Sequence, residues 1–142
     1  MRWITLSTRK KSGELLDLYD VLDAIPDNDY VWHLIEFYGF GAAPEGMNIS
    51  EFEQLVLRSE ISYTFSWLEL RQFARGLHQA IDCLLVANRG MIRKKYFFDE
   101  LRGNLEEFVA YVIYVNDGEQ WEVAVEEDEA NTESVVATLV SL

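Results

Sequence analysis

An apolar stripe at helical spacing runs through the segment that follows Ser66. Ser66 and Glu69 have the spacing of a capping box, in which each side chain accepts a hydrogen bond from a free backbone N–H at a helix start. Apolar residues then recur every three or four positions, as the buried face of a helix requires: Leu70, Phe73, Ala74, Leu77, Ile81, Leu84 and Leu85. We therefore expect one long helix over residues 66–89, supplying much of the core.

A second constraint is the segment from Tyr30 to Tyr38, which is almost wholly apolar and rich in β-formers. A strand covered on both faces reads as such a continuous apolar run. We expect it to lie centrally in a sheet. The glycine-rich residues 39–46 would then form a loop.

Weaker patterns complete the fold. Residues 106–115 and 120–126 flank the turn sequence Asn116-Asp117-Gly118 and predict a β-hairpin. Residues 2–6 suit a short strand, 13–25 a helix, and the spacing of Ser50 and Glu53 a further capped helix. Residues 132–142 fit a terminal helix or an edge strand. We expect one α+β domain over residues 1–142: about four mostly antiparallel strands, the hairpin beside the central strand, packed on a long central helix and shorter helices.

Size and apolar content agree with this expectation. A chain of 142 residues, 49% of them hydrophobic, has the commonest length of one domain and can build one core. No apolar run approaches the roughly 20 residues that cross a bilayer. The basic residues 9–11 follow the first apolar residues, the reverse of the order in a secretory signal. A single cysteine, Cys83, is compatible with a reducing compartment. We expect a cytoplasmic protein with no membrane partner.

The charge is strongly negative and unevenly placed. The net charge is −13. Residues 12–60 carry eleven acidic groups against one basic group, and residues 106–142 carry ten against none. Phosphate contacts depend on Lys and Arg, so direct binding to nucleic acid or anionic lipid is not expected. Such a charge would instead steer a basic protein towards the chain, or would serve solubility alone.

Acidic residues in these two segments are therefore the candidate binding residues. We expect an acidic surface formed by Asp17, Asp20, Asp23, Asp27, Asp29, Glu119, Glu126, Glu127, Asp128 and Glu129. The first three recur every third residue, where like charges repel on a helix, so they should contribute nothing to the local fold.

Catalytic and metal-binding patterns are weak. His78 and Asp82 would stand one turn apart on the expected helix, but zinc sites need a closer cluster of His and Cys. Cys83 suits a small buried residue, and Glu36 is the one acid inside the apolar strand, near His33. No catalytic residue, metal or cofactor is predicted.

Three hypotheses for function remain. The profile favours a small inhibitor of the immunity or antitoxin type, which would occlude a basic, nuclease-like bacterial toxin with its acidic surface. A nucleic-acid mimic that blocks a DNA-binding enzyme is the first alternative. The second is a small enzyme using His33, His78 or Glu36, which would need a pocket holding two of them.

Overall fold

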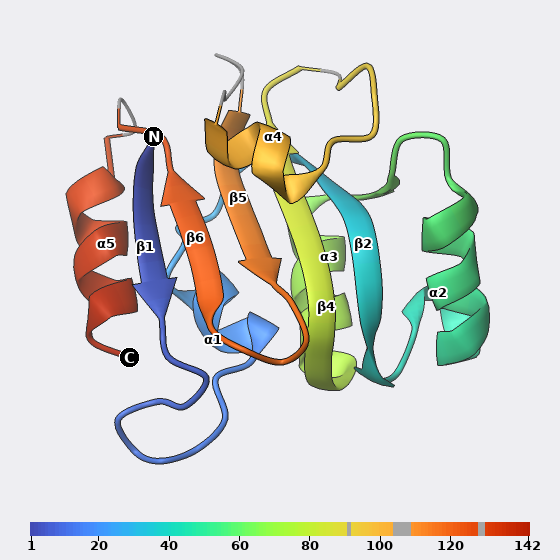
Figure 1. The fold of residues 1–142 in the computed structure, drawn as a ribbon, viewed down its shortest axis with the longest axis horizontal. Helices are drawn as coiled ribbons and strands as arrows, with labels where there is room; N and C mark the ends of the chain where they lie inside the picture. The colour runs from blue at the N-terminus through green and yellow to red at the C-terminus, as the bar shows by residue number, and fades with distance from the viewer. Residues whose placement is uncertain (91, 104–108, 128–129) are drawn as a thin grey trace.

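The fold is α+β and is built on one antiparallel sheet (Figure 1). The computed structural model describes residues 1–90, 92–103, 109–127 and 130–142. Within them, six strands lie in the order β1-β6-β5-β4-β2-β3. The strands are β1 (Arg2–Leu6), β2 (Val31–Gly41), β3 (Tyr63–Phe65), β4 (Leu77–Asn88), β5 (Val109–Val115) and β6 (Trp121–Val125). The prediction of α+β is confirmed, and the sheet is wider than the four strands expected.

Helices cover the two faces of the sheet unequally. They are α1 (Leu18–Asp23), α2 (Ile49–Arg58), α3 (Trp67–Gly76), α4 (Phe98–Gly103) and α5 (Thr132–Val140), with a 3₁₀ turn at Pro44–Gly46. In Figure 1, α1 and α3 lie behind the sheet, α2 and α5 flank its two ends, and α4 lies in front. We call the face under α1 and α3 the far face and the face under α4 the near face.

Each face has its own apolar core. On the far face, the fully buried ring of Trp32 lies between the rings of Trp67 and Tyr111, at centroid distances of 5.4 and 5.7 Å. A smaller core on the near face groups Leu84, Val86 and Val112 of the sheet with residues of α4 and of the segment before it. Covering both faces explains why the central strands are apolar at nearly every position.

The long helix predicted over residues 66–89 is wrong. The helix ends at Gly76, and residues 77–88 form the strand β4. Residues 83–87 are apolar and buried on both strand faces, and an uninterrupted apolar run matches helical spacing as well as strand spacing. Leu77 and Ile81, expected in the buried helix face, are only half-buried in β4.

Two glycines allow β2 to pass close to β4. The predicted loop at residue 39 does not form, because β2 continues to Gly41. A Cβ at Gly39 would lie 2.4 Å from the carbonyl oxygen of Gln79, and one at Gly41 would lie 2.4 Å from that of Gly76. Gly41 also has φ 134°, which side chains rarely adopt. In the strand order, β4 lies between β2 and the hairpin, so the expected position of the hairpin beside β2 is wrong.

The predicted helix starts have different outcomes. The Ser66–Glu69 capping box is confirmed in both directions. The Ser50 box is not: Asn48 caps α2, accepting from the N–H groups of Ser50 and Glu51. The helix expected over 13–25 is shorter and begins after Asp17.

Other predicted elements are confirmed. β1 forms at residues 2–6, the terminal segment forms the helix α5, and the hairpin turns at Asn116-Asp117-Gly118 with Val115 opposite Trp121. The start of the predicted hairpin, residues 106–108, lies outside the described residues. None of the helices in the described part of the chain combines the length and apolar character needed to cross a bilayer.

Candidate functional site

The near face carries acidic residues around one tyrosine. The strand registers place Glu36 opposite Leu84, Leu84 opposite Tyr114, and Tyr114 opposite Glu122. Residues directly opposite in a sheet share a face. Asp82 comes from the same face of β4, opposite Tyr38, and Asp99 from α4. We call Glu36, Asp82, Asp99 and Glu122 the acidic face.

The electrostatics of this group follow from burial and mutual repulsion. Partial burial raises the pKa of Tyr114, and the acidic residues of this face raise it further. The pKa of Glu36 is also raised, first by burial and then by the charge of Asp82, while Lys95 opposes the shift. Both effects disfavour added negative charge and favour an incoming cation.

Few of these charges are neutralised within the fold. Glu122 pairs with Arg102. Asp82 accepts a hydrogen bond from the backbone N–H of Asp117 at 2.7 Å, which ties it to the hairpin turn. Lys95 is directed to the end of α2, where its Nζ lies 2.9–3.3 Å from the carbonyl oxygens of Val56, Leu57 and Ser59. Among the described residues, neither Glu36 nor Asp82 has a salt bridge.

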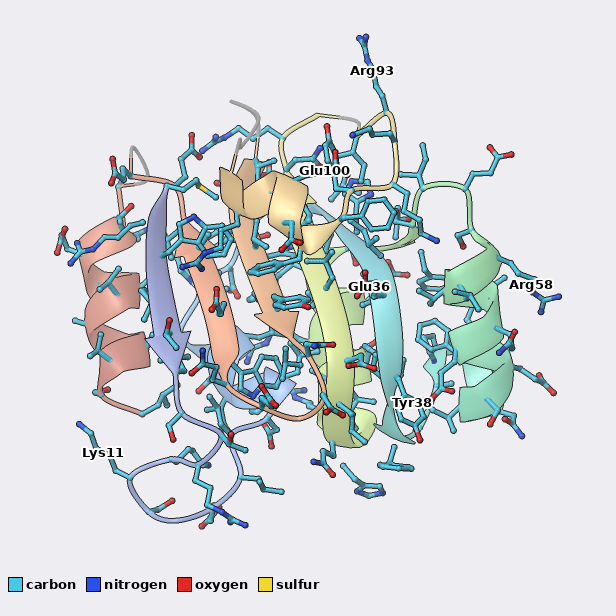
Figure 2. All side chains as sticks on the ribbon, viewed as in Figure 1. Lys11, Glu36, Tyr38, Arg58, Arg93 and Glu100 are labelled. Carbon is cyan, nitrogen blue, oxygen red and sulfur yellow. The ribbon has the colours of Figure 1, made fainter. Side chains whose placement is uncertain are left out.

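A pocket adjoins the acidic face between β2, α2 and the segment before α4. Its volume is about 400 Å³. Figure 2 shows Glu36 and Tyr38 on the near side of β2, between β4 and α2. The lining includes three carboxylates and three exposed apolar side chains: Glu36, Glu53, Asp82, Tyr38, Leu57 and Phe97. We call this the Glu36 pocket.

The acidic residues predicted on the first segment have structural contacts. Asp17 and Asp20 form a reciprocal capping box at the start of α1, so the expectation that they contribute nothing locally is wrong. Asp20 also pairs with Lys10, and Asp23 pairs with Arg71 of α3. Their predicted role in binding stays a prediction.

The remaining predicted residues are spread over opposite ends of the sheet. Asp27 accepts from the indole N–H of Trp67, and Asp29 is exposed before β2. Glu126 pairs with Arg89 at one end of β6, while Glu119 lies in the turn at its other end. Glu127 is exposed; Asp128 and Glu129 lie outside the described residues. The eight of these ten residues that the structure describes therefore do not form one continuous patch.

His33 belongs to a buried polar group. Its Nδ1 lies 2.8 Å from Ser62 Oγ and its Nε2 lies 3.0 Å from Asn88 Oδ1. Burial lowers the pKa of His33, and the neutral ring then accepts from Ser62 and donates to Asn88. This Ser–His–Asn order resembles hydrolytic triads, but His33 is 6% exposed and does not line the Glu36 pocket.

The other candidate chemistry is separated in space. His78 and Asp82 are not a helix pair: in β4 they lie roughly 13 Å apart along the strand. Cys83 is fully buried, and burial raises the pKa of its thiol, which keeps it protonated. Of His33, His78 and Glu36, only Glu36 lines the Glu36 pocket. Within the described residues, no three His, Cys, Asp or Glu side chains are grouped to hold a metal ion.

Sequence reasoning missed Glu53, Asp82, Asp99 and Glu122 as one neighbourhood with Glu36. They come from two strands and two helices, and only the order of the strands and the packing of α2 and α4 bring them together. Glu36 itself was noticed, because it interrupts an apolar strand. No family model, curated protein or solved structure matches this chain.

Proposed function

We propose that the chain is a protein-binding module that inhibits a basic partner, as immunity proteins and antitoxins inhibit nuclease toxins. The observation that carries the proposal is the acidic face, whose residues Glu36 and Asp82 have no salt bridge among the described residues. Uncompensated carboxylates cost free energy when they are partly buried. A basic partner would offset that cost on binding.

The mechanism is occlusion. Lys and Arg side chains that a nuclease uses on phosphates would contact carboxylates on the near face. The overall charge of −13 would accelerate encounter, and closer contacts would slow dissociation. The predicted acidic residues outside the near face, Glu127 among them, would act in encounter more than in the bound complex. A cytoplasmic location is part of the proposal.

The proposal is tested by capturing and assaying the partner. The immobilised chain is exposed to native lysate, retained proteins are eluted with salt, and each is purified and assayed for nuclease activity against increasing amounts of the chain. We expect a basic nuclease that loses activity at equimolar ratio, with an association rate falling roughly tenfold or more as salt screens the charges.

Two results contradict the proposal. One is the absence of any retained basic protein. The other is a retained protein whose catalytic activity is unchanged when it is saturated with the chain. Retention of a DNA-binding enzyme that has no nuclease activity, and whose DNA binding is blocked, would support the nucleic-acid mimic instead.

A further inference from the structure

We infer that the Glu36 pocket binds the guanidinium group of one arginine side chain of a protein partner. The inference rests on the proposed function and names the group recognised. We assign an organic cation to the pocket, and not a metal ion, because no group of three potential metal ligands occurs among the described residues.

Charge complementarity is the first argument. Among the described residues, three carboxylates line the pocket, from Glu36, Glu53 and Asp82, against one cation, Lys95. The Lys95 ammonium already contacts three carbonyl oxygens at the end of α2. Glu53 accepts one hydrogen bond through Oε1, from the backbone N–H of Gly39 at 3.3 Å, and among the described residues its Oε2 has no hydrogen bond or salt bridge. The lining therefore offers several acceptors to a donor-rich cation.

The shape and lining of the pocket favour arginine over lysine. Tyr38 is 45% exposed and Phe97 is 66% exposed, so aromatic surface is available beside the carboxylates. A planar guanidinium stacks on such rings and donates to two carboxylates at once, whereas an ammonium is a compact, strongly hydrated charge. Leu57, 67% exposed, offers contact for the aliphatic part of the side chain. About 400 Å³ is within the range of pockets that hold small organic groups.

The free-energy cost of keeping the Glu36 carboxylate charged supports the same assignment of arginine to the pocket. Burial and the neighbouring Asp82 both raise the pKa of Glu36, so the fold holds its charged form at a disadvantage. An arginine between Glu36 and Asp82 would remove that disadvantage, because an opposite charge within a few ångströms stabilises both carboxylates. The lining lacks a protein cation in that position among the described residues.

The test uses a blocked arginine, Nα-acetyl-arginine N-methylamide, titrated into the isotopically labelled full chain and followed by NMR. We expect saturable binding on the order of millimolar affinity, as suits so small a ligand. Shifts should be confined to residues of the Glu36 pocket. The citrulline analogue, which has the same shape without the charge, and blocked lysine should each bind at least severalfold more weakly.

Two variants complete the test. Glu36→Gln should weaken binding of the blocked arginine roughly 10- to 100-fold, the effect of one charge-assisted hydrogen bond. Glu14→Gln removes one exposed carboxylate outside the pocket and should leave affinity unchanged. Because Glu36→Gln is expected to raise stability, loss of binding in that variant cannot be attributed to unfolding; a thermal melt checks this.

The outcomes separate the pocket from the proposed function. Shifts spread over the surface, equal binding of citrulline or lysine, or unchanged affinity in Glu36→Gln would overturn the arginine assignment. If a basic partner is captured and its affinity survives Glu36→Gln, the proposed function stands and the pocket assignment fails. If blocked arginine binds in the pocket but no basic partner is captured, the pocket stands and the proposed function fails.

Discussion

The two faces of the sheet are covered to different extents. The far face is closed by α1 and α3, whose residues Leu22 and Leu70 are fully buried. Among the described residues, α4 and the segment before it cover the near face at Leu84, Val86 and Val112; the adjoining half carries Glu36, Asp82 and the Glu36 pocket. The difference indicates that stability resides mainly in the far face. The open half retains charges that do not favour folding.

The sharpest way to break this comparison is to truncate two aromatic residues of the same strand. Trp32 of β2 is fully buried on the far face, and Tyr38 is 45% exposed on the near face. Trp32→Ala should lower the free energy of unfolding by about 3–5 kcal/mol, and Tyr38→Ala by less than about 1 kcal/mol. Denaturant unfolding measures both. Equal losses would mean that the two faces contribute alike.

A second comparison concerns the helices on each side. Ser66 caps α3, which covers the far face, whereas Ser50 lies inside α2, beside the pocket, where Asn48 is the cap. Ser66→Ala should cost about 1 kcal/mol of unfolding free energy. Ser50→Ala should change it by less than about 0.5 kcal/mol. The opposite order, measured by the same unfolding curves, would contradict these cap assignments.

The acidic face predicts a substitution that stabilises the chain. The pKa of Glu36 is raised in the fold above its ordinary value of 4.5, so folding favours the protonated form. The resulting penalty is fully present at neutral pH and diminishes as pH falls through the folded pKa towards 4.5. Glu36→Gln should therefore raise the melting temperature at pH 7 and remove this pH dependence. A lower melting temperature at pH 7 would show that the charge stabilises the fold.

Burial of His33, in the covered half of the near face, predicts that stability falls with decreasing pH, the opposite of the effect of Glu36. Burial lowers its pKa below the ordinary value of 6.5, so the unfolded chain binds the proton first. Stability is fully present above pH 6.5 and declines as pH falls from there towards the folded pKa. In the His33→Gln variant, this pH-dependent loss of stability should vanish. Thermal melts recorded between pH 5 and 8 measure the difference. An unchanged pH profile in the variant would exclude His33 as its source.

Local signals predicted the elements that depend on neighbouring residues. Asn116-Asp117-Gly118 determines a turn between two strands, and Ser66 with Glu69 determines a helix start, and both are found. The end of α3 was missed because the apolar positions after Gly76, from Leu77 to Leu85, fit the spacing of a helix as well as that of a strand. The signal available was Gly76 itself, a poor helix former at the point where the helix ends.

The candidate site depended on contacts that sequence spacing does not contain. Glu36 could be noticed as the acid in an apolar strand, but Asp82 was assigned to a helix and paired with His78. Once residues 77–88 form a strand next to β2, Asp82 comes opposite Tyr38 and close to Glu36. The runs of acidic residues are conspicuous in the sequence, but their spacing does not reveal that Asp17 and Asp20 form the capping box of α1.

The pairing of β1 with β6 has a consequence for synthesis on the ribosome. Thr5 pairs with Glu122, so β1 must wait for the translation of every other strand before its partner exists. At roughly 5–20 residues per second, the delay is on the order of ten seconds. During that time β1 is an unpaired hydrogen-bonding edge. Closing so large a loop also makes this pairing a slow, late event in folding, and the nascent chain is most exposed to aggregation before it occurs.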